Sequence, residues 1–281
     1  MTGTVLITGC SSGYGEAAAK LFASRGWNVI ATMRNPDDGR RLTDLKNILV
    51  LRLDVQDRDS IDKAITEAIS HFGRIDAVVN NAGYGLFSPF EPASREAIQK
   101  QFDVNVFGAM DVIRAILPHF RANRSGTIIN ISSGAGAFGA AMASIYCASK
   151  FALEGFSESL SYELADLGIK VKIIEPGGAP GTGFMTRSQA ETGGLPIPDD
   201  YNAFMAHAAQ IYEGVAANSD SDAVGKVVEA IFAAATDGTD QLRHMPNDDI
   251  SPLLTARRES SEQEFIALMR GFFLPRPSTS A

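Results

Sequence analysis

Three side chains with acid–base or hydrogen-bonding groups stand close together in the middle of the chain: Ser133, Tyr146 and Lys150. The tyrosine and the lysine are four residues apart, so a helix would place them on one face. A neighbouring ammonium favours the phenolate and lowers the pKa of a phenol, which otherwise titrates near pH ~10. We therefore expect Tyr146 to exchange protons near neutral pH.

A glycine-rich turn lies near the start of the chain, between an apolar run and a helical pattern. Glycines at such a turn let backbone N–H groups approach the pyrophosphate of a dinucleotide, and the positive end of the helix dipole attracts it. A glycine-rich turn alone can be a simple turn, but its place between strand and helix favours dinucleotide binding. The expected cofactor-binding residues here are Gly9, Ser11, Ser12, Gly13, Tyr14 and Gly15.

Short β-rich runs alternate with amphipathic stretches that are long enough to be crossover helices. The expected strands are residues 5–8, 28–33, 48–53, 75–80, 127–131 and 170–174. The expected helices are residues 13–25, 59–71, 94–120, 144–166 and 222–235. This rhythm predicts an α/β fold, a Rossmann-type doubly wound parallel sheet with helices on both faces, whose ligand lies at the carboxyl ends of the strands.

The end of the second expected strand bears on which dinucleotide is bound. An NAD site would place an acid there to hold the ribose hydroxyls, whereas this chain has Met33 followed by Arg34. Because an arginine can pair with a 2′-phosphate, we expect NADP(H) in preference to NAD(H). The alternative is that Arg34 is a solvated surface charge and that NAD is accepted. Arg40 and Arg41 either supplement this site or belong to the surface.

Two further strand ends carry groups that suit the adenosine half of a dinucleotide. Asp54 and Val55 offer a carboxylate and a backbone amide for an adenine edge. Asn81, Ala82 and Gly83 follow the next strand and would line the ribose. Each is an ordinary turn residue by itself. Their placement at successive strand ends favours a ligand site.

A single domain spanning residues 1–281 is expected, because the strand and helix patterns continue without a linker. The alternation fails over about residues 178–214, where prolines and glycines are interspersed with large apolar residues. We interpret this segment as a substrate lid; a packing excursion or an oligomer contact is the alternative. Residues 275–281 are expected to be frayed.

The composition excludes several classes of partner. A net charge of −8 and a pI near 5.1 predict no nucleic-acid or anionic-membrane surface. The chain has no secretory signal pattern and no apolar stretch long enough to span a bilayer, so a cytoplasmic protein is expected. Cys10 and Cys147 lack metal-ligand spacing, and neither a metal site nor a disulfide is expected. Cys147 follows the tyrosine directly, but a packing role is favoured over a reactive thiol.

The motifs resemble those of the short-chain dehydrogenase/reductase family. The resemblance runs from about residue 4 to residue 177 and rests on five motifs in the correct order: Thr8-Gly9-x-x-x-Gly13-x-Gly15, Asn80-Asn81-Ala82-Gly83, Asn105, Ser133 and Tyr146-x-x-x-Lys150. Arg34, Tyr84-Gly85 and Glu175-Pro176-Gly177 look most like the NADP-preferring branch that contains 17-beta-hydroxysteroid and retinol dehydrogenases.

The resemblance implies a role for each residue of the reacting centre. Tyr146 would donate a proton to a carbonyl oxygen during reduction or accept one during alcohol oxidation, while hydride passes between nicotinamide and carbon. Ser133 would bind the substrate oxygen. Lys150 would lower the pKa of Tyr146 and hold the nicotinamide-ribose hydroxyls, and Asn105 would anchor a water that relays protons. The family also implies a homodimer or homotetramer built from the helices after Ser94 and Ser144.

One departure from the family pattern concerns the loop after Pro176 and Gly177. The family usually has three residues between this glycine and a threonine that contacts the nicotinamide carboxamide, whereas this chain has four before Thr182. We expect Pro176 and Gly177 to contact the cofactor, and Thr182 to do so if the loop accommodates the extra residue.

Together these patterns predict an NADP(H)-dependent oxidoreductase that interconverts a fairly apolar ketone or aldehyde and its alcohol. Apolar residues around Tyr84 and in the lid predict an apolar substrate pocket. The alternative is a protein that binds NADPH, senses its level and signals to a partner without turnover.

Overall fold

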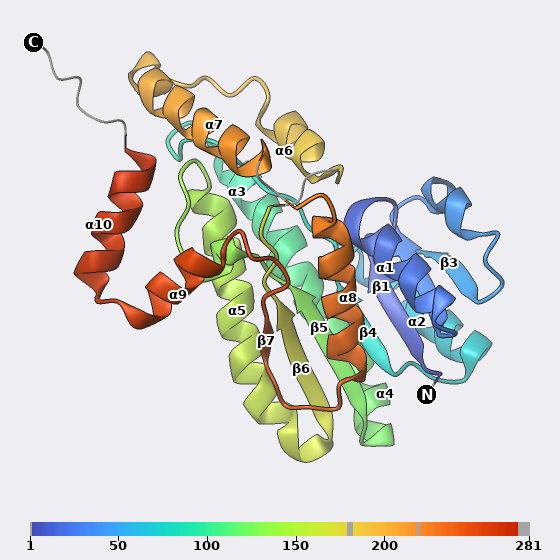
Figure 1. The fold of residues 1–281 in the computed structure, drawn as a ribbon. Coiled ribbons are helices and arrows are strands. Elements are labelled where there is room, and N and C mark those ends of the chain that lie inside the picture. Colours follow the sequence, from blue (N-terminus) through green and yellow to red (C-terminus); the bar gives the residue numbers. More distant parts are fainter. Residues whose placement is uncertain (1, 179–181, 218–219, 275–281) are drawn as a thin grey trace, which may run out of the picture.

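The computed structural model describes residues 2–178, 182–217 and 220–274 (Figure 1). One parallel sheet forms the centre of the molecule, with strand order β3-β2-β1-β4-β5-β6-β7. Its strands are β1 (Thr4–Thr8), β2 (Asn28–Met33), β3 (Ile48–Arg52), β4 (Ala77–Asn80), β5 (Gly126–Ile131), β6 (Ile169–Ile174) and β7 (Arg243–His244). The chain moves outward from β1 in one direction and from β4 in the other. The expected doubly wound sheet is therefore confirmed.

Helices cover both faces of this sheet, as Figure 1 shows. The helices that the structure describes are α1 (Gly13–Ser24), α2 (Arg58–Phe72), α3 (Arg95–Phe102), α4 (Gly108–Asn123), α5 (Ser144–Leu164), α6 (Phe184–Thr192), α7 (Asn202–Ala217), α8 (Ala223–Thr236), α9 (Ser251–Glu259) and α10 (Glu262–Phe273). Local chemistry sets several of their ends. In α2, the Asp57 side chain accepts a hydrogen bond from Ser60 N at 3.2 Å, and Gly73 ends the helix with a φ of 80°.

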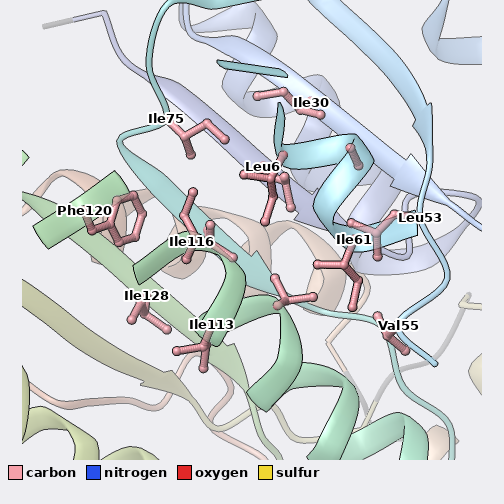
Figure 2. Close-up of a cluster of buried hydrophobic side chains, with 14 of the residues drawn as sticks. Leu6, Ile30, Leu53, Val55, Ile61, Ile75, Ile113, Ile116, Phe120 and Ile128 are labelled. Atoms are coloured by element: carbon pink, nitrogen blue, oxygen red, sulfur yellow. The ribbon is translucent and has the colours of Figure 1, made fainter. Parts of the chain in front are cut away.

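Two buried clusters hold the helices to the sheet. In the first, Ile61 of α2 and Ile113 and Ile116 of α4 pack against Leu6 and Ile128 of the sheet (Figure 2). The second, on the opposite face, unites α1 and α8 with the other side of the same strands. Every residue of β1 is buried. This central strand therefore lacks the alternation of buried and exposed residues that is typical of a strand with one solvated face.

The expected helix over residues 94–120 is present, but it is not one continuous α-helix. The structure divides it into α3, a π-helical turn (Asp103–Phe107) and α4. A π-helical turn carries one extra residue in its hydrogen-bonded ring, and such turns are frequent at functional sites. Asn105 lies inside this turn.

The C-terminal part contains elements that the sequence patterns did not predict. The expected lid holds two helices, α6 and α7, although residues 179–181 of that segment lie outside the described residues, as does the tail 275–281. Beyond α8, the two-residue strand β7 pairs with β6, and α9 and α10 follow. The rings of Tyr212 in α7 and Phe273 in α10 are 6.4 Å apart, so the two helices meet. Within the described residues, no helix combines the length and apolar character needed to cross a membrane.

Candidate active site

A cavity of about 950 Å³ opens at the carboxyl ends of the strands, where a doubly wound sheet binds its ligands. It brings together most of the residues that the motifs singled out. They are Gly9, Ser11, Ser12, Gly13, Tyr14, Arg34, Asp54, Val55, Asn81, Ala82, Gly83, Ser133, Tyr146, Lys150, Pro176, Gly177 and Thr182. All predicted site residues lie in the described part of the chain, and two of them, Gly15 and Asn105, do not line the cavity.

The glycine-rich turn is fixed against the end of β4. Gly9 has a φ of 73°, and a Cβ there would lie 3.0 Å from the Cα of Ala82. A Cβ on Gly15 would press into the carbonyl oxygen of Gly9 and lie 2.6 Å from the Asn81 Nδ2 atom. Gly15 therefore lets α1 begin tightly against the turn, which is why it packs behind the cavity and does not line it.

Hydrogen bonds join the ends of β1 and β4 beneath the cavity. The Thr8 hydroxyl accepts hydrogen bonds from the backbone N–H groups of Asn81 and Ala82, each at 3.0 Å. The Asn81 side chain in turn donates to the carbonyl oxygens of Thr8 and Gly9 at 2.8 and 3.2 Å. This cross-link holds the turn open for an anion above its backbone N–H groups.

Ser133, Tyr146 and Lys150 form the polar centre of the cavity. Ser133 ends the loop after β5; its Oγ atom accepts a hydrogen bond from Ala135 N at 3.2 Å and is also hydrogen-bonded to the Tyr146 hydroxyl. The Lys150 Nζ atom lies 5.7 Å from the centre of the Tyr146 ring and donates to the Ile131 carbonyl oxygen at 2.7 Å. Both Tyr146 and Lys150 are at least nine-tenths buried. Ser133, Tyr146 and Lys150 thus line one cavity, and their roles in it stay predictions.

Burial decides the protonation of this centre. It raises the pKa of the Tyr146 phenol to about 12, against the opposing hydrogen bond from Ser133. It also lowers the pKa of the Lys150 ammonium to about 8, although the carboxylate of Glu154 works in the other direction. The expected lowering of the Tyr146 pKa is thus not seen, because removal of the phenol from water raises this pKa. The phenol is held in its protonated, donor form.

Asn105 ties the π-helical turn to its neighbours. Its Nδ2 atom donates to the Tyr84 carbonyl oxygen at 2.9 Å and to the Ser149 hydroxyl at 3.2 Å, and its Oδ1 atom accepts from Tyr84 N at 3.1 Å. The Ser149 hydroxyl donates to the Tyr146 carbonyl oxygen at 2.7 Å. Asn105 therefore supports the helix that carries Tyr146, and its implied part in a proton relay stays a prediction.

The other singled-out residues lie as follows. Thr182 faces the glycine-rich turn, since a Cβ on Gly13 would be 3.4 Å from the Thr182 Cβ atom. Asp54 accepts a hydrogen bond from Gln56 N at 3.1 Å at the far end of the cavity. Burial raises the pKa of the Cys147 thiol, which fits the packing role.

Sequence reasoning missed the wall that the C-terminal segment supplies. Asn247 accepts a hydrogen bond from Gly177 N at 3.2 Å, and Asp249 accepts one from Gly178 N at 2.9 Å, so this segment fixes the loop after β6. Beyond it, α9 and α10 add Leu253, Phe272 and Phe273 to the cavity wall, beside Met205, Ala208 and Tyr212 of the expected lid. The apolar spacing within residues 251–273 was the available signal, but it does not say where a helix docks.

Known proteins share this arrangement. The family model described as short chain dehydrogenase matches residues 3–192, about two thirds of the chain. The chain belongs to this short-chain dehydrogenase family. Human retinol dehydrogenase 8 is 34% identical over 276 residues, covering 92% of this chain and 86% of that protein. Human 17-beta-hydroxysteroid dehydrogenase type 1 is 33% identical over 270 residues, covering 90% and 80%.

A solved short-chain dehydrogenase from Streptomyces avermitilis is similar over nearly its whole length. It is 31% identical, covers 96% of this chain and 99% of its own, and superposes with a TM-score of 0.80. The predicted family and fold are therefore confirmed, and the chain is an oxidoreductase that acts on CH–OH groups with an NAD(P)(H) cofactor. The residues fit such a cofactor, because the glycines of the turn leave room for it above their backbone. The buried Tyr14 hydroxyl beside that turn has no hydrogen-bond partner among the described residues.

Proposed function

We propose that this protein is an NADP(H)-dependent oxidoreductase that interconverts a fairly apolar ketone or aldehyde and its alcohol. The supporting observation is the convergence of Ser133, Tyr146 and Lys150 in one cavity with the glycine-rich turn. The bound cofactor supplies or accepts the hydride. The protein's own groups handle the proton and the charge on the substrate oxygen.

Tyr146 is the proposed acid and base. A phenol with a pKa near 12 is protonated at neutral pH and stands ready to protonate the oxygen of a reduced carbonyl. Ser133, which is hydrogen-bonded to the same hydroxyl, binds that oxygen and stabilises its developing charge. Lys150, charged below about pH 8, holds ribose hydroxyls and favours the phenolate that remains after the proton leaves.

The preference for NADP(H) rests on the end of β2. Arg34 lines the far end of the cavity beside Met33, where a carboxylate would otherwise accept hydrogen bonds from the ribose. Arg40 and Arg41 pair instead with Asp37 at 3.4 Å and Glu16 at 3.2 Å, which makes them poor candidates for the same task. Within the described part of the chain the Arg34 guanidinium has no ion-pair partner, and such a group at this place suits a 2′-phosphate.

An apolar substrate is favoured by the walls around Tyr146. The Phe87 and Phe184 rings lie 5.4 and 5.8 Å from the Tyr146 ring, measured between centroids. Tyr212 and Phe273 add aromatic surface from α7 and α10. A pocket with such walls gains affinity from burying carbon-rich substrate.

The expected homo-oligomer and cytoplasmic location stay predictions. Large apolar side chains at Phe107, Phe151 and Tyr162 are exposed on the π-helical turn and on α5. Their exposure supports pairing of two copies through the helices named in the sequence analysis.

The test is NADPH consumption across a panel of apolar ketones and aldehydes, with NADH in parallel and Tyr146→Phe as the control. We expect turnover that prefers NADPH and needs Tyr146. Tight NADPH binding without turnover on any member of the panel would favour the alternative, a sensor of NADPH.

A further inference from the structure

Two guanidinium groups face the same end of the cavity. Arg34 comes from the end of β2 and Arg187 from the first turns of α6, and both line the cavity. In the part of the chain that the structure describes, neither guanidinium forms an ion pair or a hydrogen bond. Burial and the positive charge of Arg34 lower the pKa of Arg187, against the carboxylates of Glu191 and Asp54, which favour its charged form. Two like charges that face one space are stabilised when an anion lies between them.

The acid that would normally neutralise Arg187 is engaged elsewhere. Glu191 lies four residues further along α6, the spacing at which an arginine and a glutamate pair on a helix. Its two carboxylate oxygens instead accept hydrogen bonds from Lys100 Nζ of α3, at 3.0 and 2.7 Å. Among the described residues Arg187 therefore forms no ion pair with Glu191, although that carboxylate still favours its charged form.

Arg187 is held at the cavity wall by Tyr84. Its Cζ atom lies 4.9 Å from the centre of the Tyr84 ring, a cation–π distance. Tyr84 is itself buried, and its backbone is fixed by hydrogen bonds to Asn105 and Gln101. A stacked guanidinium on a rigid ring loses little further freedom when it binds an anion.

The start of α6 lies over the glycine-rich turn. A Cβ on Gly183 would be 3.6 Å from the Ser12 hydroxyl oxygen, and Thr182 faces Gly13 at 3.4 Å. Arg187 follows within the next turn, and its backbone N–H donates to the Gly183 carbonyl oxygen at 3.0 Å. The helix thus carries Arg187 along the cofactor groove from the pyrophosphate end toward Arg34 and Asp54.

We propose that Arg187 is a second cofactor-specificity residue, which binds the 2′-phosphate of NADP(H) together with Arg34. This inference rests on the proposed NADP(H) preference and adds a contact from the expected lid. A planar guanidinium offers paired N–H donors that match phosphate oxygens. The alternative target is the pyrophosphate, which NAD(H) and NADP(H) share, and the test must separate the two.

The experiment measures the dissociation constants of NADPH and NADH by cofactor fluorescence for the full chain and three variants. Arg187→Ala removes the proposed contact, and Arg34→Ala removes its partner. Arg40→Ala is the matched control, because Arg40 is exposed, pairs with Asp37 and does not line the cavity. The same proteins are titrated with 2′,5′-ADP and with ADP by calorimetry, and their folding is checked by thermal melting without ligand.

We expect Arg187→Ala to weaken NADPH and 2′,5′-ADP about tenfold, the effect of one charge-assisted contact, with NADH and ADP unchanged. Arg34→Ala should act in the same way and Arg40→Ala should have no effect. Equal weakening of NADPH and NADH by Arg187→Ala would assign it to the pyrophosphate and overturn the inference. A wild-type preference for NADPH that Arg187→Ala leaves undiminished also overturns it, while leaving the proposed function intact. Equal wild-type affinity for NADPH and NADH would contradict both the inference about Arg187 and the proposed preference for NADP(H).

Discussion

Lys150 and Glu154 lie one turn apart on the same face of α5, and both side chains are buried. The Glu154 carboxylate favours the charged form of Lys150 and so opposes the effect of burial on the pKa of that ammonium. Arg243 of β7 donates to Glu154 at 3.0 Å, and it also lies 3.8 Å from the buried Glu175. The reacting centre is thus connected to the sheet edge by a chain of charges.

Replacing Glu154 with glutamine should lower the pKa of Lys150 below its value of about 8, because a source of negative charge is lost. Lys150 is protonated only below its pKa, so cofactor binding that needs the ammonium should weaken at a lower pH than in the wild type. The measurement is the NADPH dissociation constant as a function of pH.

Glu158→Gln is the control for that experiment. Glu158 also pairs with Arg243, at 2.6 Å, but its side chain is 42% exposed. Glu158→Gln should leave the pH dependence of NADPH binding unchanged. A profile that moves equally in both variants, or in neither, contradicts the assigned role of Glu154.

The substitution Arg258→Ala should destabilise the fold. Arg258 of α9 lies 3.1 Å from both carboxylate oxygens of Glu175, which is fully buried after β6. Its loss leaves that carboxylate with Arg243 alone, at a cost of about 1–3 kcal/mol in the free energy of unfolding. Chemical denaturation should show a change of about 1 kcal/mol or less for Arg257→Ala, whose pair with Glu262 is more exposed. Equal changes in the free energy of unfolding would show that the buried pair stabilises the fold no more than the exposed pair does.

The substitution Gly15→Ala should lower both stability and cofactor affinity. The new methyl group would press into the Gly9 carbonyl oxygen, and relief of that overlap costs about 1–3 kcal/mol. Gly271→Ala is the matched case, because Gly271 lies in α10 and, among the described residues outside its own stretch of helix, no heavy atom comes within 4 Å of the added Cβ. There the free energy of unfolding should stay the same or rise by up to about 1 kcal/mol. Denaturation with and without NADPH compares the two variants.

Alkylation of the native protein should leave its activity intact. Cys147 follows the tyrosine of the reacting centre, yet burial raises the pKa of its thiol and keeps it in the unreactive protonated form. Iodoacetamide treatment at neutral pH, followed by activity and mass measurement, checks this. Rapid inactivation with one added label on Cys147 would show a reactive thiol.

Much of the site could be predicted because the parallel sheet gathers strand ends into one place. Thr8 and Asn81 are far apart in sequence, yet Thr8 ends one β-rich run and Asn81 directly follows another, and the structure joins them by hydrogen bonds. Helix spacing likewise placed Tyr146 and Lys150 side by side. Patterns of this kind depend on local periodicity, which the sequence displays openly.

Other features depend on tertiary contacts and could not be predicted. The pKa of Tyr146 is raised because the phenol is buried, and motif spacing does not report burial. Arg187 lines the cavity and stacks on Tyr84, while Lys100, far away in the chain, pairs with Glu191. The docking of α10 on α7 is another long-range result. The single-domain assignment and the closing of the lid stay predictions.

The central claim is that Tyr146 transfers the proton during NADPH-dependent carbonyl reduction. Single-turnover oxidation of NADPH, with an apolar ketone and Tyr146→Phe beside the wild type, tests it most directly. The rate of the variant should fall by about 10²–10⁴-fold, the usual contribution of a general acid, while NADPH still binds. An unchanged single-turnover rate in Tyr146→Phe would contradict the account.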